Sequence, residues 1–264
     1  MPLQSVFLWN ARGLMTKLSE LKLFLSHPTP SVVCITETHL ENWHSPRFPG
    51  YMIYRQDRAD GYGGLLILVS AHLQQRAADL EPIADGQMQT LAVDTAHMGS
   101  WSKILLFYNP CLPITQTEFE HYFSHFPSLG LRISSVAILM PIIHFGAAHI
   151  PSQTGQESLF NAVSKTPLLL PNTPGVPTRL DPHSGTGSVL DLFFGSSPYF
   201  PYSVSLGLDL GSDHTLLLKS TPQQTPRIKS VPQWSLPQRT RTQEWDSWAV
   251  ALSNRSIPQG NTPQ

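Results

Sequence analysis

Hydrophobic residues along the chain fall into short runs that are separated by polar turns. Residues 5–9 and 31–35 are two such runs, and each predicts a short buried strand. Between them, leucines recur over residues 14–25 at the spacing of one face of an amphipathic helix, which ends before two prolines. This strand–helix–strand opening is long enough for the two strands to pair in parallel.

The rest of the chain predicts many strands and few helices. The glycine-rich stretch 61–64 lies between two apolar runs and predicts a hairpin or a bulged loop. Aromatic residues over 119–126 have helical spacing and predict a second helix that packs its aromatic face into the core. With no repeat along the chain, the pattern predicts an α/β fold with two packed mixed β-sheets flanked by helices, a four-layer α/β sandwich. The further runs that predict strands are 51–54, 65–69, 88–93, 103–108, 136–140, 190–194, 204–208 and 215–218.

From residue 221 onward the composition shifts to Pro, Gln, Ser, Thr and Arg. Polar sequence rich in proline cannot bury enough apolar surface to fold alone. We therefore predict one folded domain over residues 1–220 and a Pro/Gln-rich linker over residues 221–264 that leads toward a downstream domain.

The bulk composition narrows the functional classes. The 264 residues are long enough for one large core, and 41% of them are hydrophobic. Only 13% are charged and the net charge is −1, which excludes a broadly basic nucleic-acid binder. Contact with DNA would need locally placed Lys and Arg together with a metal ion.

Cysteine content and hydropathy indicate the cellular compartment in which we expect the protein. Cys34 and Cys111 are too few for a disulfide framework and suit a reducing environment. The apolar runs are too short to cross a membrane, and no secretory leader opens the chain. We expect an intracellular monomer that has no membrane association.

Polar residues follow several of the predicted strands, where α/β folds tend to place their sites. They are Asn10, Glu37, Tyr108-Asn109, Asp191 and Ser212-Asp213-His214. Each has a structural explanation when taken alone: Asn10 can cap the helix that follows it, and Glu37 can be a solvated loop carboxylate. Asp191 differs, because an aspartate between apolar residues is costly to bury without a partner such as His214.

Taken together, the order and spacing of these residues resemble the endonuclease/exonuclease/phosphatase family, and most closely the endonuclease domain of jockey-type non-LTR retrotransposons. The resemblance covers roughly residues 3–219. The stretch at 177–183, Pro-Thr-Arg-Leu-Asp-Pro-His, is especially similar to the retrotransposon proteins. The other matching stretches are Trp-Asn-Ala-Arg-Gly at 9–13, Ile-Thr-Glu-Thr-His-Leu at 35–40, Pro-Gly-Tyr at 49–51, Tyr-Arg at 54–55 with Asp-Arg at 57–58, Gly-Gly at 63–64, Tyr-Asn-Pro at 108–110, Gly-Ser-Val-Leu-Asp at 187–191 and Gly-Ser-Asp-His at 211–214.

The resemblance implies a metal site. Glu37 would be the main ligand of a Mg²⁺ or Mn²⁺ ion, since hard cations prefer carboxylate oxygens. Asp213 would be a second carboxylate on the metal side. Asn10 would orient the metal shell or the scissile phosphate through its amide.

The resemblance also implies catalytic and DNA-binding roles. His214 would contact the phosphate while Asp191 holds its imidazole in place, the orienting logic of other Asp–His pairs. Tyr108 would donate a hydrogen bond to a phosphate oxygen. Thr178 would line the DNA-binding surface, and Arg12, Arg55, Arg58 and Arg179 would contact phosphates. The reaction would be in-line attack of water on a DNA phosphodiester.

One motif of the family is missing. Relatives carry Gly-Asp-Phe-Asn directly after the strand that corresponds to residues 136–140, and its Asp orients or deprotonates the attacking water. Here Pro-Ile-Ile-His follows at 141–144, and residues 121–156 contain no Asp, Glu or Asn. Loss of a positioned general base costs about 10²–10⁴ in rate. We therefore expect a severely impaired nuclease.

The function expected from the resemblance is nicking of nuclear target DNA to prime reverse transcription, with a reverse transcriptase as the downstream domain. Two alternatives stay open. One is a catalytically dead DNA- or protein-binding remnant. The other is a phosphoesterase of the same fold that acts on a lipid or a nucleotide, although the stretch at 177–183 argues against it.

Overall fold

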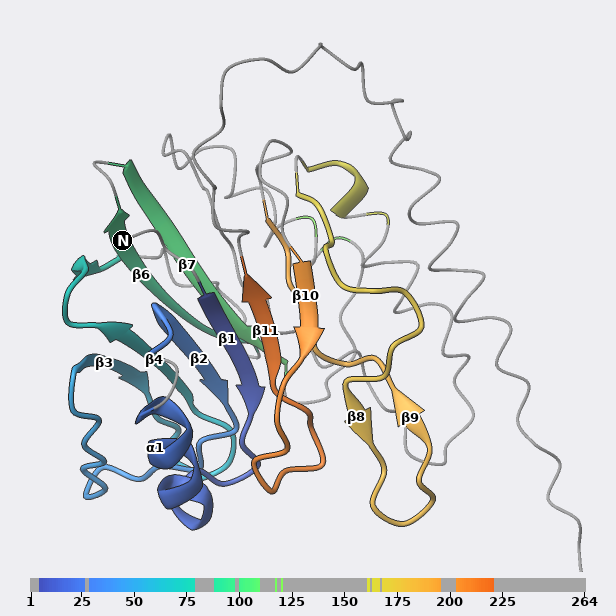
Figure 1. Ribbon diagram of the computed structural model, residues 1–264, viewed down its shortest axis with the longest axis horizontal. Coiled ribbons are helices and arrows are strands. Elements are labelled where there is room, and N and C mark those ends of the chain that lie inside the picture. The colour runs from blue at the N-terminus through green and yellow to red at the C-terminus, as the bar shows by residue number, and fades with distance from the viewer. Residues whose placement is uncertain are drawn as a thin grey trace, which may run out of the picture.

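A computed structural model provides the structure, and it describes residues 5–26, 29–78, 88–97, 100–109, 117, 120, 161, 163–166, 168–195 and 203–220. Figure 1 shows how their elements are arranged. The helix expected at 119–126, the strand expected at 136–140, the missing motif and the expected linker at 221–264 lie outside the described residues, apart from position 120.

A six-stranded mixed sheet forms the larger layer, with the strand order β10-β11-β1-β2-β4-β3. β1 and β2 pair in parallel, as the strand–helix–strand pattern predicted, and Asn10 lies opposite Thr36. β3 and β4 form the predicted antiparallel hairpin around the glycine-rich stretch. The strands are β1 (Ser5–Asn10), β2 (Val32–Thr36), β3 (Tyr51–Gln56), β4 (Leu65–Ser70), β10 (Ser203–Leu206) and β11 (Leu217–Ser220).

A smaller antiparallel sheet of three strands packs on the first sheet and has the order β5-β6-β7. β6 (Gln89–His97) and β7 (Ser100–Tyr108) confirm two predicted strands. β5 (Gln74–Ala77) and the short hairpin of β8 (Arg179–Leu180) and β9 (Gly187–Ser188) were not predicted. Their sequences are polar, so they lack the hydrophobic signal that identifies a strand.

The predicted helix covers the face of the large sheet that lies away from β6 and β7 (Figure 1). It begins as a 3-10 turn, η1 (Met15–Lys17), and continues as α1 (Leu18–Ser26). Leu21 and Leu25 on its inner face are buried. A helix on one face and a second sheet on the other confirm the predicted α/β class with packed mixed and antiparallel sheets.

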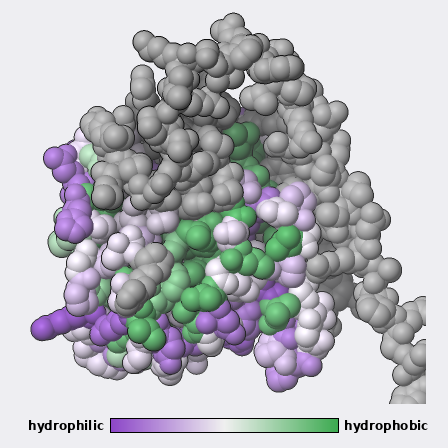
Figure 2. Space-filling view, viewed as in Figure 1, coloured by the Kyte–Doolittle hydropathy of each residue, from purple (hydrophilic) through white to green (hydrophobic). Residues whose placement is uncertain are grey.

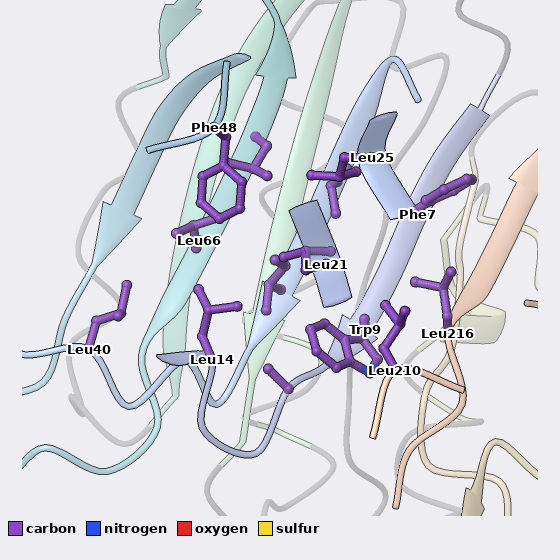
Figure 3. Close-up of a cluster of buried hydrophobic side chains, with 14 residues drawn as sticks. Phe7, Trp9, Leu14, Leu21, Leu25, Leu40, Phe48, Leu66, Leu210 and Leu216 are labelled. Carbon is purple, nitrogen blue, oxygen red and sulfur yellow. The ribbon is translucent and has the colours of Figure 1, made fainter. Parts of the chain in front are cut away.

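Burial on both faces explains why β1 is a continuous apolar run. Val6 and Leu8 point between the two sheets. Phe7 and Trp9 point to the opposite side, where they pack with Leu21 under the helix (Figure 3). Figure 2 shows polar side chains along the lower edge of the molecule, where β1 and β2 end. This polar edge carries the candidate site.

The strand predicted at residues 190–194 is wrong, since the backbone there forms no regular ladder. Side chains take the place of a partner strand. The Thr178 hydroxyl accepts hydrogen bonds from the amides of Leu190 and Asp191. The Asn172 side chain bonds to the Asp191 carbonyl and to the Phe193 amide. At the end of the segment Gly195 closes an antiparallel backbone bridge to Leu169, and Phe194 is a bridge residue as well.

Within the described part of the chain, none of the helices has the length and hydrophobicity that a membrane span requires.

Candidate active site

The site begins where the parallel strands β1 and β2 end, because their carboxyl ends meet at the same edge of the sheet. Asn10 is the last residue of β1 and Glu37 follows the end of β2. The Asn10 amide Nδ2 donates to Glu37 Oε1 over 2.7 Å, and Asn10 is buried. This bond fixes the carboxylate that the resemblance assigns to the metal.

Three non-glycine residues in this region adopt left-handed backbone conformations: Arg12 at φ 46°, Glu37 at φ 49° and His39 at φ 49°. Such a conformation costs a residue with a Cβ about 1–2 kcal/mol. Backbone hydrogen bonds between the loops hold it in place. The amide of Gly13 donates to the Glu37 carbonyl, and the amide of His39 donates to the Gly63 carbonyl, at 2.8 and 2.9 Å. Backbone strain of this kind is common at functional sites.

The second half of the site is a buried pair of His214 and Asp191. His214 Nδ1 lies 2.8 Å from Asp191 Oδ2, and both residues are at least 95% buried. Thr178 anchors the pair, because its hydroxyl accepts from the Asp191 amide and its carbonyl accepts from the Thr215 amide. The pairing lowers the cost that a lone buried aspartate would carry, although Asp191 Oδ1 accepts no hydrogen bond in the described part of the chain.

The pKa of His214 is raised from its ordinary value. Burial alone lowers it, but the Asp191 charge, the hydrogen bond to Asp191 and the charges of Asp213 and Glu37 together raise it more. The carboxylates around the ring therefore favour its protonated form relative to that of a free histidine. With Nδ1 turned to Asp191, Nε2 is the ring's remaining donor.

A short loop joins the two halves. The Ser212 hydroxyl donates to the Asn10 carbonyl over 2.8 Å and accepts from the His214 amide over 3.2 Å. Through Ser212, the end of β1 and the His214–Asp191 pair form one continuous network.

Asp213 lies against two arginines. Its Oδ2 accepts from Arg12 Nη1 at 2.7 Å and from Arg179 Nε at 2.8 Å. Burial raises the pKa of Asp213, but the hydrogen bond from Arg179 and the positive charges of His214, Arg12 and Arg179 outweigh it, so the pKa is lowered overall. The carboxylate is therefore ionised and neutralised by protein groups.

Tyr108 ends β7 and is buried, with 6% of its surface exposed. It lies beside the glycine turn that receives the hydrogen bond from His39: a Cβ on Gly63 would stand 3.2 Å from Tyr108 Cε1. Gln89, opposite Tyr108 on β6, accepts from the Gly64 amide at 2.9 Å. The turn thus joins the end of β7 to the Glu37 loop.

Thr178 lies beneath the surface that it was expected to line. Only 1% of it is exposed, and its hydroxyl is occupied by two backbone amides. The Thr178 hydroxyl therefore holds the backbone of residues 190–191 in place.

Two polar residues of this region were missed in the sequence. Gln89 and Asn172 are both buried and both bond to backbone atoms of the site loops. Neither belongs to a matching motif, and a single amide residue carries no signal in the sequence that distinguishes it from the chain's other amide residues.

The donor set tests the fit of a divalent metal. Glu37 offers a carboxylate that is 20% exposed, and its Oε2 lies 3.9 Å from His39 Nε2. Among the described residues, no three His, Cys, Asp or Glu side chains form a group that could hold an ion. Glu37 therefore fits a hard cation only where the substrate and water supply most of the ligands, a mode typical of Mg²⁺.

Comparison with known proteins identifies what this arrangement is similar to. No model of a known protein family matches the chain. Over 131 residues, 49% of the chain, it is 29% identical to the RNA-directed DNA polymerase from mobile element jockey of Drosophila melanogaster. Over 130 residues, 48% of the chain, it is 30% identical to a probable RNA-directed DNA polymerase from transposon X-element of the same organism. Each match spans 14% of the relative's length.

Solved structures share the fold. The endonuclease domain of TRAS1, a telomere-specific non-LTR retrotransposon, superposes with a TM-score of 0.64 at 14% identity and covers 84% of this chain and 98% of its own. The AP endonuclease of Leishmania major gives 0.62 at 16% identity, with 83% and 88% covered. A 3' phosphatase from Neisseria, bound to a product DNA hairpin, gives 0.58 at 14% identity, with 83% and 99% covered.

These likenesses confirm the resemblance that the motifs predicted. The chain has the fold of the endonuclease/exonuclease/phosphatase enzymes, and its sequence is similar to the polymerases of jockey-type mobile elements.

Proposed function

We propose that this chain is the metal-dependent endonuclease domain of a non-LTR retrotransposon. It nicks nuclear DNA inside the cell, so that the new 3' end primes reverse transcription by a downstream domain of the same polyprotein. The observation that carries the proposal is the buried His214–Asp191 pair joined through Ser212 to the Asn10–Glu37 pair. Similarity to DNA-directed enzymes of this fold supports it.

Each residue of the site would have its own role in the reaction. Glu37 would hold Mg²⁺ or Mn²⁺, with Asn10 fixing the position of its carboxylate. When bound, the ion would stabilise negative charge on the phosphate and on the leaving oxygen. The protonated His214 would donate from Nε2 to a phosphate oxygen, and Asp191 would hold the ring and its charge in place. Tyr108 would donate to the phosphate from the end of β7.

The proposal includes impaired turnover, because the sequence has no Asp, Glu or Asn between residues 121 and 156. A nuclease of this family without its positioned water-activating aspartate would be slower by about 10²–10⁴. The same feature favours a second candidate, a remnant that binds DNA or protein without cleaving it.

Nicking of supercoiled plasmid by the full chain tests both candidates. We expect slow nicking in Mg²⁺ or Mn²⁺ that stops on addition of a chelator and is absent from the His214→Ala variant. Arg76→Ala serves as the control, since Arg76 lies on β5 of the other sheet and pairs with Asp94. No nicking from folded protein that still binds DNA would favour the remnant. Nicking that persists in chelator would overturn the metal-dependent mechanism.

A further inference from the structure

We propose that Asp213 is a positioning residue that holds Arg12 and Arg179 as a pair for a backbone phosphate of DNA, and that it does not bind the metal. The proposal rests on the function proposed above and reassigns one residue of that site. The two arginines come from distant segments, Arg12 from the loop after β1 and Arg179 from β8. Asp213 brings them together.

The Asp213 carboxylate is poorly placed to coordinate a metal ion. A single oxygen, Oδ2, receives both guanidinium groups at 2.7 and 2.8 Å. The other oxygen, Oδ1, accepts no hydrogen bond in the described part of the chain, but it is buried, so a hydrated ion cannot reach it from solvent. A divalent ion on this carboxylate would lie within a few ångströms of two positive charges, and like charges at that separation repel strongly.

The two arginines differ in how much of each side chain is exposed to solvent, and this difference favours the binding of an anion. Arg179 is 13% exposed and also lies 3.8 Å from Asp181, so protein groups enclose most of it. Arg12 is 54% exposed, and its side chain bonds to no other described residue than Asp213. One edge of its guanidinium therefore faces solvent while the other edge is fixed. A guanidinium held in this way binds phosphate oxygens with little loss of side-chain entropy.

A third basic residue completes the local charge. Lys17 Nζ donates to the Arg12 carbonyl at 3.1 Å and to the Gly13 carbonyl at 3.4 Å. Its methylene groups lie 4.0 Å from the position of a Cβ on Gly211, two residues before Asp213. In a chain of net charge −1, these contacts concentrate positive charge beside His214. Phosphate contacts of this local kind position an enzyme on the duplex.

The backbone places the pair next to the proposed reaction centre. Arg179 is bridged to His214, and the Leu180 amide donates to the Asp213 carbonyl at 2.9 Å. The ligand of the arginine pair is therefore expected to be a phosphate that neighbours the one contacted by His214.

The test asks whether Asp213→Asn strengthens or weakens DNA binding. Asp213→Asn removes one negative charge, so simple electrostatics predicts tighter DNA binding. Loss of a positioning residue predicts weaker binding, because the arginines are no longer held. Binding of the full chain to a fluorescent 20-base-pair duplex is measured by anisotropy in chelator over a series of salt concentrations. Binding of Mn²⁺ alone is measured by electron paramagnetic resonance.

We expect Asp213→Asn and Arg12→Met each to weaken DNA binding about ten-fold. Each should lower the slope of log affinity against log salt by about one. Mn²⁺ affinity should stay within about two-fold for both variants, whereas Glu37→Gln should lose it. The double variant should lose less affinity than the two single losses combined, because both changes disable Arg12. Arg12→Met changes an exposed side chain, so it stays informative if Asp213→Asn is unstable.

Arg76→Ala is the matched control, because Arg76 is also an exposed arginine paired with a buried aspartate, at 61% and 6% exposure. It should leave DNA and Mn²⁺ binding unchanged. Tighter DNA binding together with lost Mn²⁺ binding in Asp213→Asn would overturn the inference and leave the proposed function standing. Failure of the wild-type chain to bind DNA at all would overturn both.

Discussion

Replacement of Thr178 by valine tests whether one buried hydroxyl organises the His214–Asp191 half of the site. Thr178 is 1% exposed, and its Oγ1 accepts from the amides of Leu190 and Asp191 at 2.9 and 3.0 Å. Valine has nearly the same shape but no acceptor. Both amides would then be buried without the acceptor that they use in the structure.

The magnitude follows from those two amides. A buried donor without a partner costs about 1–3 kcal/mol, so Thr178→Val should lower the free energy of unfolding by about 2–6 kcal/mol. For a domain of this size that corresponds to a fall in melting temperature of about 4–24 °C. Thr178→Ser keeps the acceptor and loses one buried methyl, which costs about 1 kcal/mol.

Urea unfolding of the full chain measures the difference between the two variants, and hydrogen exchange reports where it arises. We expect the amides of Leu190 and Asp191 to lose protection in Thr178→Val and to keep it in Thr178→Ser. If the valine variant were within about 0.5 kcal/mol of the serine variant, the hydroxyl would not organise this segment. The explanation given for the irregular backbone at residues 190–194 would then be wrong.

A glycine substitution and a change of pH test other parts of the polar edge that carries the candidate site. Gly64→Ala should destabilise the domain by about 2–4 kcal/mol, because φ is +87° and the new Cβ would meet the buried Thr38 hydroxyl at 2.5 Å. Gly50→Ala, at φ +82° with nothing within 4 Å, should cost only about 1 kcal/mol in the same thermal melts, and equal losses would refute the clash. The pKa of Asp181 is lowered to about 2 by hydrogen bonds from the Ser184 amide and hydroxyl and from the His183 amide. Because the folded pKa lies below the ordinary value of 3.8, this stabilisation is present above pH 4 and is lost as the pH falls toward 2. Protection of the Ser184 amide from exchange should fall over that range, and a constant protection factor would contradict it.

The sequence predicted the parts of the fold that hydrophobic spacing encodes. β1, α1 and β2 were predictable because each buries a regular set of apolar positions, and their order required parallel pairing. That pairing in turn brings Asn10 and Glu37 to one edge. The meeting of Asp191 with His214 was predictable for a different reason, namely the cost of burying an unpaired carboxylate.

Where side chains replace backbone pairing, the sequence was a poor guide. The apolar run at residues 190–194 has the composition of a strand, but Thr178 and Asn172 satisfy its backbone from a segment with no periodic pattern. The burial of Thr178 could not be read from a residue type that is as common on surfaces as in turns. The two arginines on Asp213 depend on tertiary contacts between positions about 200 and 34 residues apart, which no local pattern records.

The central claim is that the chain carries a nuclease site that lacks only its water-activating group. Restoring the missing motif tests this claim most directly. Pro141→Gly, Ile142→Asp, Ile143→Phe and His144→Asn together would place Gly-Asp-Phe-Asn where relatives of this family carry it. The measurement is the plasmid-nicking rate of the full chain in Mg²⁺ before and after the replacement. The account predicts a gain of about 100-fold or more that requires His214. No gain from a folded variant, or a wild-type rate already equal to that of an intact relative, would contradict it.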